Sequence, residues 1–107
     1  MIVVSDTSPI IYLKLVGAIE VLPQIFGRVY VPDAVFQELK SFQNPRLESV
    51  REWAGSAPPW PEIRHPTLTD PLLTASGLDG GEIAALLLAQ ELRADRLLID
   101  DRDGRAP

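Results

Sequence analysis

Two hydrophobic runs, near opposite ends of this chain, end in carboxylates. The first covers residues 2–6 and ends in Asp6, and the second covers residues 97–101 and ends in Asp100 and Asp101. Short apolar runs of this kind are typical of strands in the middle of a parallel sheet, where both faces are covered. Ligands of such sheets bind beyond the carboxyl ends of the strands, so both runs should bring their acids to one edge. Because converging carboxylates repel one another, the pattern favours a site for a hard cation such as Mg²⁺, which prefers oxygen ligands.

The other hydrophobic patterns alternate between helix and strand. We expect further strands at residues 28–31 and 60–65 and helices at about 9–16, 18–26, 32–42, 47–54 and 79–93. Prolines concentrated between residues 57 and 71 predict a surface connection with at most an edge strand. The helix at 79–93 is apolar nearly all round and should be buried. This order of elements favours a layered α/β domain built on a parallel sheet.

The composition limits the class of protein. We expect a single domain over residues 1–107 with a modest core. The absence of cysteine and the single histidine, His65, exclude disulfides and make a multi-histidine metal site a poor explanation. The chain has neither an apolar run near the roughly 20 residues of a membrane span nor a signal-peptide pattern, so we expect a cytoplasmic protein with no membrane partner. The net charge of -5 disfavours passive nucleic-acid binding, but bound cations could still support a nuclease.

Asp6 and Glu38 each stand where a structural and a functional role compete. Asp6 is either a metal ligand or the cap of the first helix. Because Ser8 is expected to cap that helix and Pro9 to open it, we favour the functional role. The spacing of Glu38 places it on the apolar face of its helix, where a carboxylate is costly unless it is paired or coordinated. The alternatives for Glu38 are an exposed position at the edge of that face or an ion pair with Lys40 or a distant arginine.

Glu82 and the aspartates after the second acidic run present the same choice. Asp79 and Glu82 have the spacing of a capping box, and from spacing alone capping is the stronger interpretation. The apolar helix that follows places Glu82 near the interior and keeps a metal role open. Acids in a turn are usually solvated. Directly after a buried strand, however, at least one should face the edge where Asp6 lies, and we favour Asp101, with Asp100 as an auxiliary ligand.

Four stretches resemble the PIN-domain family, in particular small prokaryotic proteins related to VapC toxins. They are residues 4–11 (VSDTSPII), 31–39 (VPDAVFQEL), 78–85 (LDGGEIAA) and 97–102 (LLIDDR), and they follow one another in the order of the family. The resemblance implies a three-layer α/β fold with a central parallel sheet flanked by helices. It also implies a metal-dependent endoribonuclease that uses one or two Mg²⁺ or Mn²⁺ ions.

The resemblance further implies the site residues and the partners. Acids at the positions of Asp6, Glu38, Glu82 and Asp101 are the catalytic residues of the family, and Asp6, Asp100, Asp101 and Glu82 are the implied metal ligands. The implied substrate is RNA. The implied protein partners are a second copy of the chain, forming a homodimer, and, for the toxin of a toxin–antitoxin pair, an antitoxin.

The segment after Asp101 departs from the family pattern and leaves other functions open. Similar proteins continue with further helices and a strand, so we expect the C-terminal part of the fold to be missing and the activity to be weak or absent. The alternative function is an inactive truncated module that acts through antitoxin binding or dimerisation. A phosphatase with Asp6 as nucleophile is disfavoured, because the second acid that such sites carry two residues later is absent.

Overall fold

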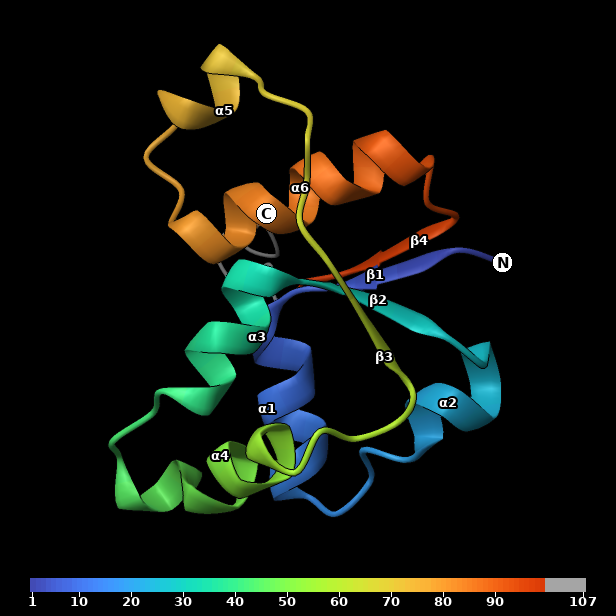
Figure 1. The fold of residues 1–107 in the computed structure, drawn as a ribbon, viewed down its shortest axis with the longest axis vertical. Coiled ribbons are helices and arrows are strands. Elements are labelled where there is room, and N and C mark those ends of the chain that lie inside the picture. Colours follow the sequence, from blue (N-terminus) through green and yellow to red (C-terminus); the bar gives the residue numbers. More distant parts are fainter. Residues whose placement is uncertain (100–107) are drawn as a thin grey trace, which may run out of the picture.

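The computed structural model describes residues 1–99, which build one four-stranded sheet. The strands are β1 (Val3–Ser5), β2 (Val29–Pro32), β3 (Pro61–Arg64) and β4 (Arg96–Leu98). They lie in the order β3-β2-β1-β4, and all three neighbouring pairs are parallel. The expected parallel sheet is confirmed, with the first acidic strand, β1, inside it and β3 at one end (Figure 1).

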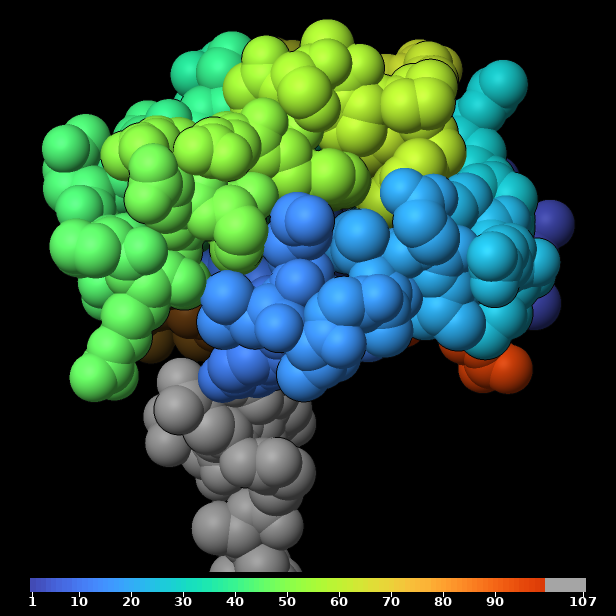
Figure 2. Space-filling model, turned by 90° about the horizontal axis from the view of Figure 1, so that it is seen from below, coloured from blue at the N-terminus to red at the C-terminus, as the bar shows by residue number. Residues whose placement is uncertain are grey.

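Helices cover both faces of this sheet. They are α1 (Thr7–Leu15), α2 (Val21–Phe26), α3 (Asp33–Lys40), the 3₁₀ helix η1 (Pro45–Leu47), α4 (Glu48–Gly55), α5 (Pro71–Thr74) and α6 (Gly80–Leu92). Figure 1 shows α6 on one side of the strands and α1, α3 and α4 on the other. Figure 2 looks at this second side and shows α1, α2 and α4 side by side over it. The predicted three-layer α/β architecture is therefore confirmed. Within residues 1–99, no helix is long and apolar enough to cross a membrane.

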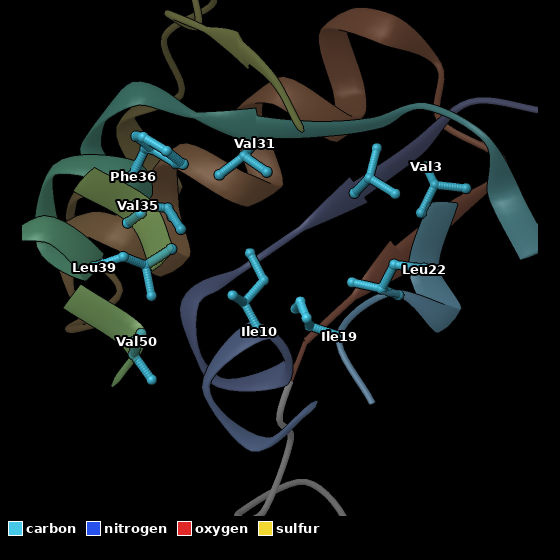
Figure 3. Close-up of a cluster of buried hydrophobic side chains, with 11 residues drawn as sticks. Val3, Ile10, Ile19, Leu22, Val31, Val35, Phe36, Leu39 and Val50 are labelled. Carbon is cyan, nitrogen blue, oxygen red and sulfur yellow. The ribbon is translucent and has the colours of Figure 1, made fainter. Parts of the chain in front are cut away.

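The side chains of the central strands supply both hydrophobic cores. Val3 of β1 and Val29 and Val31 of β2 belong to the larger core, together with residues of α1 to α4 (Figure 3). Val4 and Tyr30 belong to the smaller core, which lies against α6. Successive side chains of a strand point to opposite faces, so consecutive apolar residues need cover on both sides. This requirement is why the apolar run at the start of the chain predicts a central strand.

The second acidic strand is less buried than the sequence predicts. Arg96 of β4 is exposed, and Leu97 and Leu98 are half-buried. Within residues 1–99, β1 is the only strand that pairs with β4, so β4 lies at an end of the described sheet. The prediction of a fully buried strand is therefore wrong for this part of β4. An apolar run indicates a strand, but its place in the sheet depends on distant segments.

The first helix begins two residues earlier than the sequence predicts. α1 starts at Thr7, so Ser8 and Pro9 lie inside its first turn and Asp6 occupies the capping position. Pro9 is tolerated there because the first amides of a helix have no partner within it. The prediction that Ser8 caps this helix is therefore wrong. The Asp6 side chain makes no capping hydrogen bond to α1 either.

Helix α5 is not among the elements that the sequence predicts, and α6 is less buried than predicted. Asp70 caps α5, and its Oδ1 accepts a hydrogen bond from the amide of Leu72 at 3.0 Å. An aspartate followed by proline is a good helix start, but the surrounding prolines favoured an irregular connection. In α6, the side that faces the sheet is buried, and most of its other apolar side chains are only half-buried. The buried residues of α6 are Ala84, Ala85 and Leu88.

The connection between β3 and α5 is tied to α6 by one carboxylate. Oε1 of Glu91 accepts hydrogen bonds from the amide of Thr67 at 2.7 Å, from the Thr67 hydroxyl at 2.8 Å and from the amide of Leu68 at 3.1 Å. The Thr67 amide is the main reason why the pKa of the Glu91 carboxyl lies below its ordinary value. The irregular segment that leads to α6 is thus attached to that helix.

Candidate active site

The first strand and the last described strand end side by side. β1 and β4 are parallel, and Ser5 pairs with Leu98. The amide of Asp6 donates a hydrogen bond to the carbonyl oxygen of Leu98 at 2.8 Å. Both strands therefore end at the same edge of the sheet, where α/β folds place their ligands. Asp100 and Asp101 lie outside the described residues, so the predicted approach of Asp101 to Asp6 stays a prediction.

Asp6 is a buried carboxylate at this edge. The residue is 5% exposed, and within residues 1–99 its Oδ1 is buried without a hydrogen-bond partner. Burial raises the pKa of the Asp6 carboxyl above its ordinary value, and the charges of Asp79 and Glu38 raise it further, whereas hydrogen bonds from Thr7 lower it. A buried oxygen without a donor is costly. Such a group calls for a partner such as a bound water or ion.

Glu38 reaches this edge from α3. Its charge acts on Asp6, and its Oε1 accepts a hydrogen bond from the hydroxyl of Thr7 at 2.9 Å. Glu38 is exposed, whereas Thr7 is buried. Within residues 1–99, no ion pair joins Glu38 to Lys40 or to an arginine. Local sequence patterns do not predict the contact with Thr7, because it joins residues 31 positions apart.

Glu82 lies in the first turn of α6, beside its capping residue. Oδ1 of Asp79 accepts a hydrogen bond from the amide of Glu82 at 2.8 Å, so Asp79 is the helix cap that the sequence predicts. A hydrogen bond to the Asp79 side chain is the main reason why the pKa of the Glu82 carboxyl is raised, followed by burial and by the charges of Asp79 and Asp6. The charges of both acids therefore act on the Glu82 carboxyl. Asp79, for which the sequence predicts only a capping role, is a further acid whose charge acts on Asp6.

The donor atoms at this edge fit a hard divalent cation. Within residues 1–99, no three acidic or histidine side chains are grouped closely enough to hold a metal ion by themselves. Asp6 nevertheless offers a buried oxygen without a partner, which a cation would satisfy. Carboxylate oxygens suit Mg²⁺ and Mn²⁺, and Mg²⁺ in proteins usually keeps several waters and takes only one or two carboxylates. Asp6 and its acidic neighbours are therefore suitable donors for such an ion.

We expect Asp6→Asn to stabilise the protein in the presence of EDTA. The raised pKa means that the folded state binds a proton at Asp6 more readily than the unfolded state does. The contribution of Asp6 to stability is therefore lost as pH rises from the ordinary aspartate value through the raised value. Asparagine does not titrate, so the variant does not lose this stability as pH rises. The free energy of unfolding of Asp6→Asn should therefore exceed that of the wild type by a small amount in acid and by a larger amount at neutral pH. Urea denaturation at several pH values measures this difference, and an advantage that shrinks with rising pH would contradict the account.

One family model matches the chain. It is described as a PIN domain (DUF3368) and covers residues 2–107. The chain therefore belongs to the PIN-domain family. PIN domains are generally nucleases that act on nucleic acids, and they typically use divalent metal ions. No curated protein and no solved structure matches the chain.

Proposed function

We propose that this protein is a metal-dependent endoribonuclease of the PIN type. The proposal rests on the buried Oδ1 of Asp6, which lacks a partner within residues 1–99. Asp6 also lies close enough to Glu38 and Glu82 for their charges to interact. Membership of a family of nucleases supports the reaction class. A group of carboxylates at the ligand-binding edge of a parallel sheet is suited to metal-assisted hydrolysis of phosphodiesters.

The proposed ligands of Mg²⁺ or Mn²⁺ are Asp6, Glu82, Asp100 and Asp101. Asp6 contributes its unpartnered oxygen, and Glu82 contributes a carboxylate from the first turn of α6. Asp100 and Asp101 are included because they follow β4 in the sequence and match the family pattern. When bound, such an ion lowers the pKa of the attacking water and stabilises negative charge on the phosphate.

Glu38 is the proposed catalytic residue outside the ligand set. Its Oε1 accepts a hydrogen bond from the hydroxyl of Thr7, so we assign the proton-accepting role in catalysis to Oε2. In hydrolysis, the water oxygen bonds to phosphorus while the bond from phosphorus to the leaving oxygen breaks. A carboxylate that accepts the proton of this water assists the step. The buried hydroxyl of Thr7 restricts the rotation of the Glu38 carboxylate and so holds Oε2 in place.

The finer biological assignments rest on the resemblance to VapC-related proteins. They are an RNA substrate, a cytoplasmic location, a homodimer, and a toxin role in which an antitoxin controls the activity. The net charge of -5 opposes contact with a phosphate backbone. We therefore expect a divalent cation to be needed for RNA binding as well as for cleavage.

Cleavage of a single-stranded RNA tests the proposal, with DNA of the same sequence as a comparison. We expect the chain to cut RNA only weakly, in Mn²⁺ or Mg²⁺ and not in EDTA. Glu38→Gln should slow the reaction by roughly a hundredfold, the lower end of the range for a lost general base. Glu52→Gln is the matched control, because Glu52 is exposed on α4. Cleavage that persists in EDTA would contradict the proposal. Absence of cleavage in every metal would favour the inactive module that acts through antitoxin binding or dimerisation.

A further inference from the structure

Gly81 lies in the first turn of α6 against the acids of the candidate site. A Cβ atom at this position would lie 3.1 Å from Oε1 of Glu38, 3.4 Å from Oδ1 of Asp79 and 3.5 Å from Oγ1 of Thr7. The first of these distances is shorter than nine in ten contacts of real Cβ atoms. Among residues 1–99, no atom lies within 4 Å of a Cβ atom placed on the neighbouring Gly80. Gly80 therefore belongs to the same helical turn but lacks these contacts.

The backbone of α6 gives no reason for a glycine at this position. Gly81 lies within the helix, and positive φ angles among the described glycines occur only at Gly17, Gly27 and Gly77. Glycine is less favourable than alanine in a helix, because the unfolded chain loses more freedom on folding. The close approach of Glu38 is therefore the feature that accounts for the missing side chain.

We propose that Gly81 is a positioning residue for Glu38. The absence of a side chain at Gly81 lets the Glu38 carboxylate lie against α6 while this carboxylate accepts a hydrogen bond from the Thr7 hydroxyl. The contacted atom is the end of an exposed, flexible side chain. A methyl group at position 81 therefore moves the Glu38 carboxylate and leaves the cores in place. The effect on activity rests on the proposed nuclease function, whereas the effect on the contact between Thr7 and Glu38 does not.

The first test uses the metal-free protein and needs no activity. We expect neither Gly81→Ala nor the matched control Gly80→Ala to lower the melting temperature in EDTA, because alanine favours the helix. Thr7→Val and Glu38→Ala, made singly and together, should show non-additive shifts in melting temperature, since each removes one partner of the same hydrogen bond. This non-additivity should disappear in the Gly81→Ala background and persist in the Gly80→Ala background. Its persistence with Gly81→Ala, or a marked loss of stability in that variant, would overturn the inference.

The second test measures RNA cleavage in Mn²⁺. We expect Gly81→Ala to slow cleavage by roughly tenfold, as is usual when the support of a site residue is lost, and Gly80→Ala to have no effect. In the Glu38→Ala background, Gly81→Ala should cause no further loss, because its effect acts through Glu38. An equal additional loss in that background would overturn the positioning role. If the wild-type chain cuts no RNA, the proposed function fails, and the melting experiment still decides whether Gly81 positions Glu38.

Discussion

Replacement of Asp6 by asparagine is expected to slow metal-dependent RNA cleavage by roughly a thousandfold. A metal ion contributes several kcal/mol of charge stabilisation, and each tenfold in rate corresponds to about 1.4 kcal/mol. Asparagine keeps the size of the side chain but removes the negative charge, which the buried Oδ1 of Asp6 shares with the second carboxylate oxygen. Rates in Mn²⁺ under single-turnover conditions measure the loss in the chemical step.

Two controls make this result specific to the site. Glu52→Gln also removes one carboxylate, but from an exposed position on α4, and it should leave the rate unchanged. Melting in EDTA should show that Asp6→Asn remains folded, because this variant is expected to be more stable than the wild type without metal. If the folded Asp6→Asn protein cuts RNA at more than about a tenth of the wild-type rate, Asp6 does not hold the ion, since loss of a metal ligand costs far more.

The second large effect is expected in the core. Leu39→Ala should lower the free energy of unfolding by about 2–5 kcal/mol, the usual cost of truncating a buried leucine. Leu39 is 0% exposed and belongs to the larger core, in which α3 meets β2 and α4 (Figure 3). This loss matters for the site because Glu38 is the preceding residue on the same helix. Urea denaturation in EDTA measures the change without a contribution from bound metal.

Leu72→Ala is the matched control for the core variant. It removes the same atoms from a leucine of α5 that is 82% exposed, and surface substitutions usually change stability by about 0.5 kcal/mol or less. Similar losses for both variants would show that α3 does not anchor the larger core as the structure indicates.

The sequence predicts the layers of this fold because its strongest patterns are local. Val3 and Val4 are consecutive apolar residues in a short run, so β1 needs cover on both faces, and it lies inside the sheet. The prediction that β4 is fully buried was wrong, because the position of a strand in the sheet depends on which distant segments pair with it. The prediction that Ser8 caps the first helix was also wrong, since α1 starts at Thr7 and has Asp6, two residues before Ser8, in the capping position.

In the candidate site, too, the local features are predictable from the sequence and the long-range contacts are not. The positions of Asp6 at a strand end and of Asp79 at a helix start follow from local pattern, and the structure places both as expected. The hydrogen bond between Thr7 and Glu38 and the contact of Glu38 with Gly81 join α1, α3 and α6. These contacts depend on how three helices pack around the sheet, which local periodicity does not determine.

The most direct test of the account is calorimetric titration of Mn²⁺ into the wild-type protein and into Asp6→Asn. The account predicts that the wild type binds Mn²⁺ and that the affinity of the variant is at least tenfold weaker. At about 100 times the dissociation constant, the ion should add roughly 2.7 kcal/mol to the stability of the wild type. Equal affinity and stoichiometry in the two proteins would contradict the claim that the buried carboxylate of Asp6 holds a divalent cation.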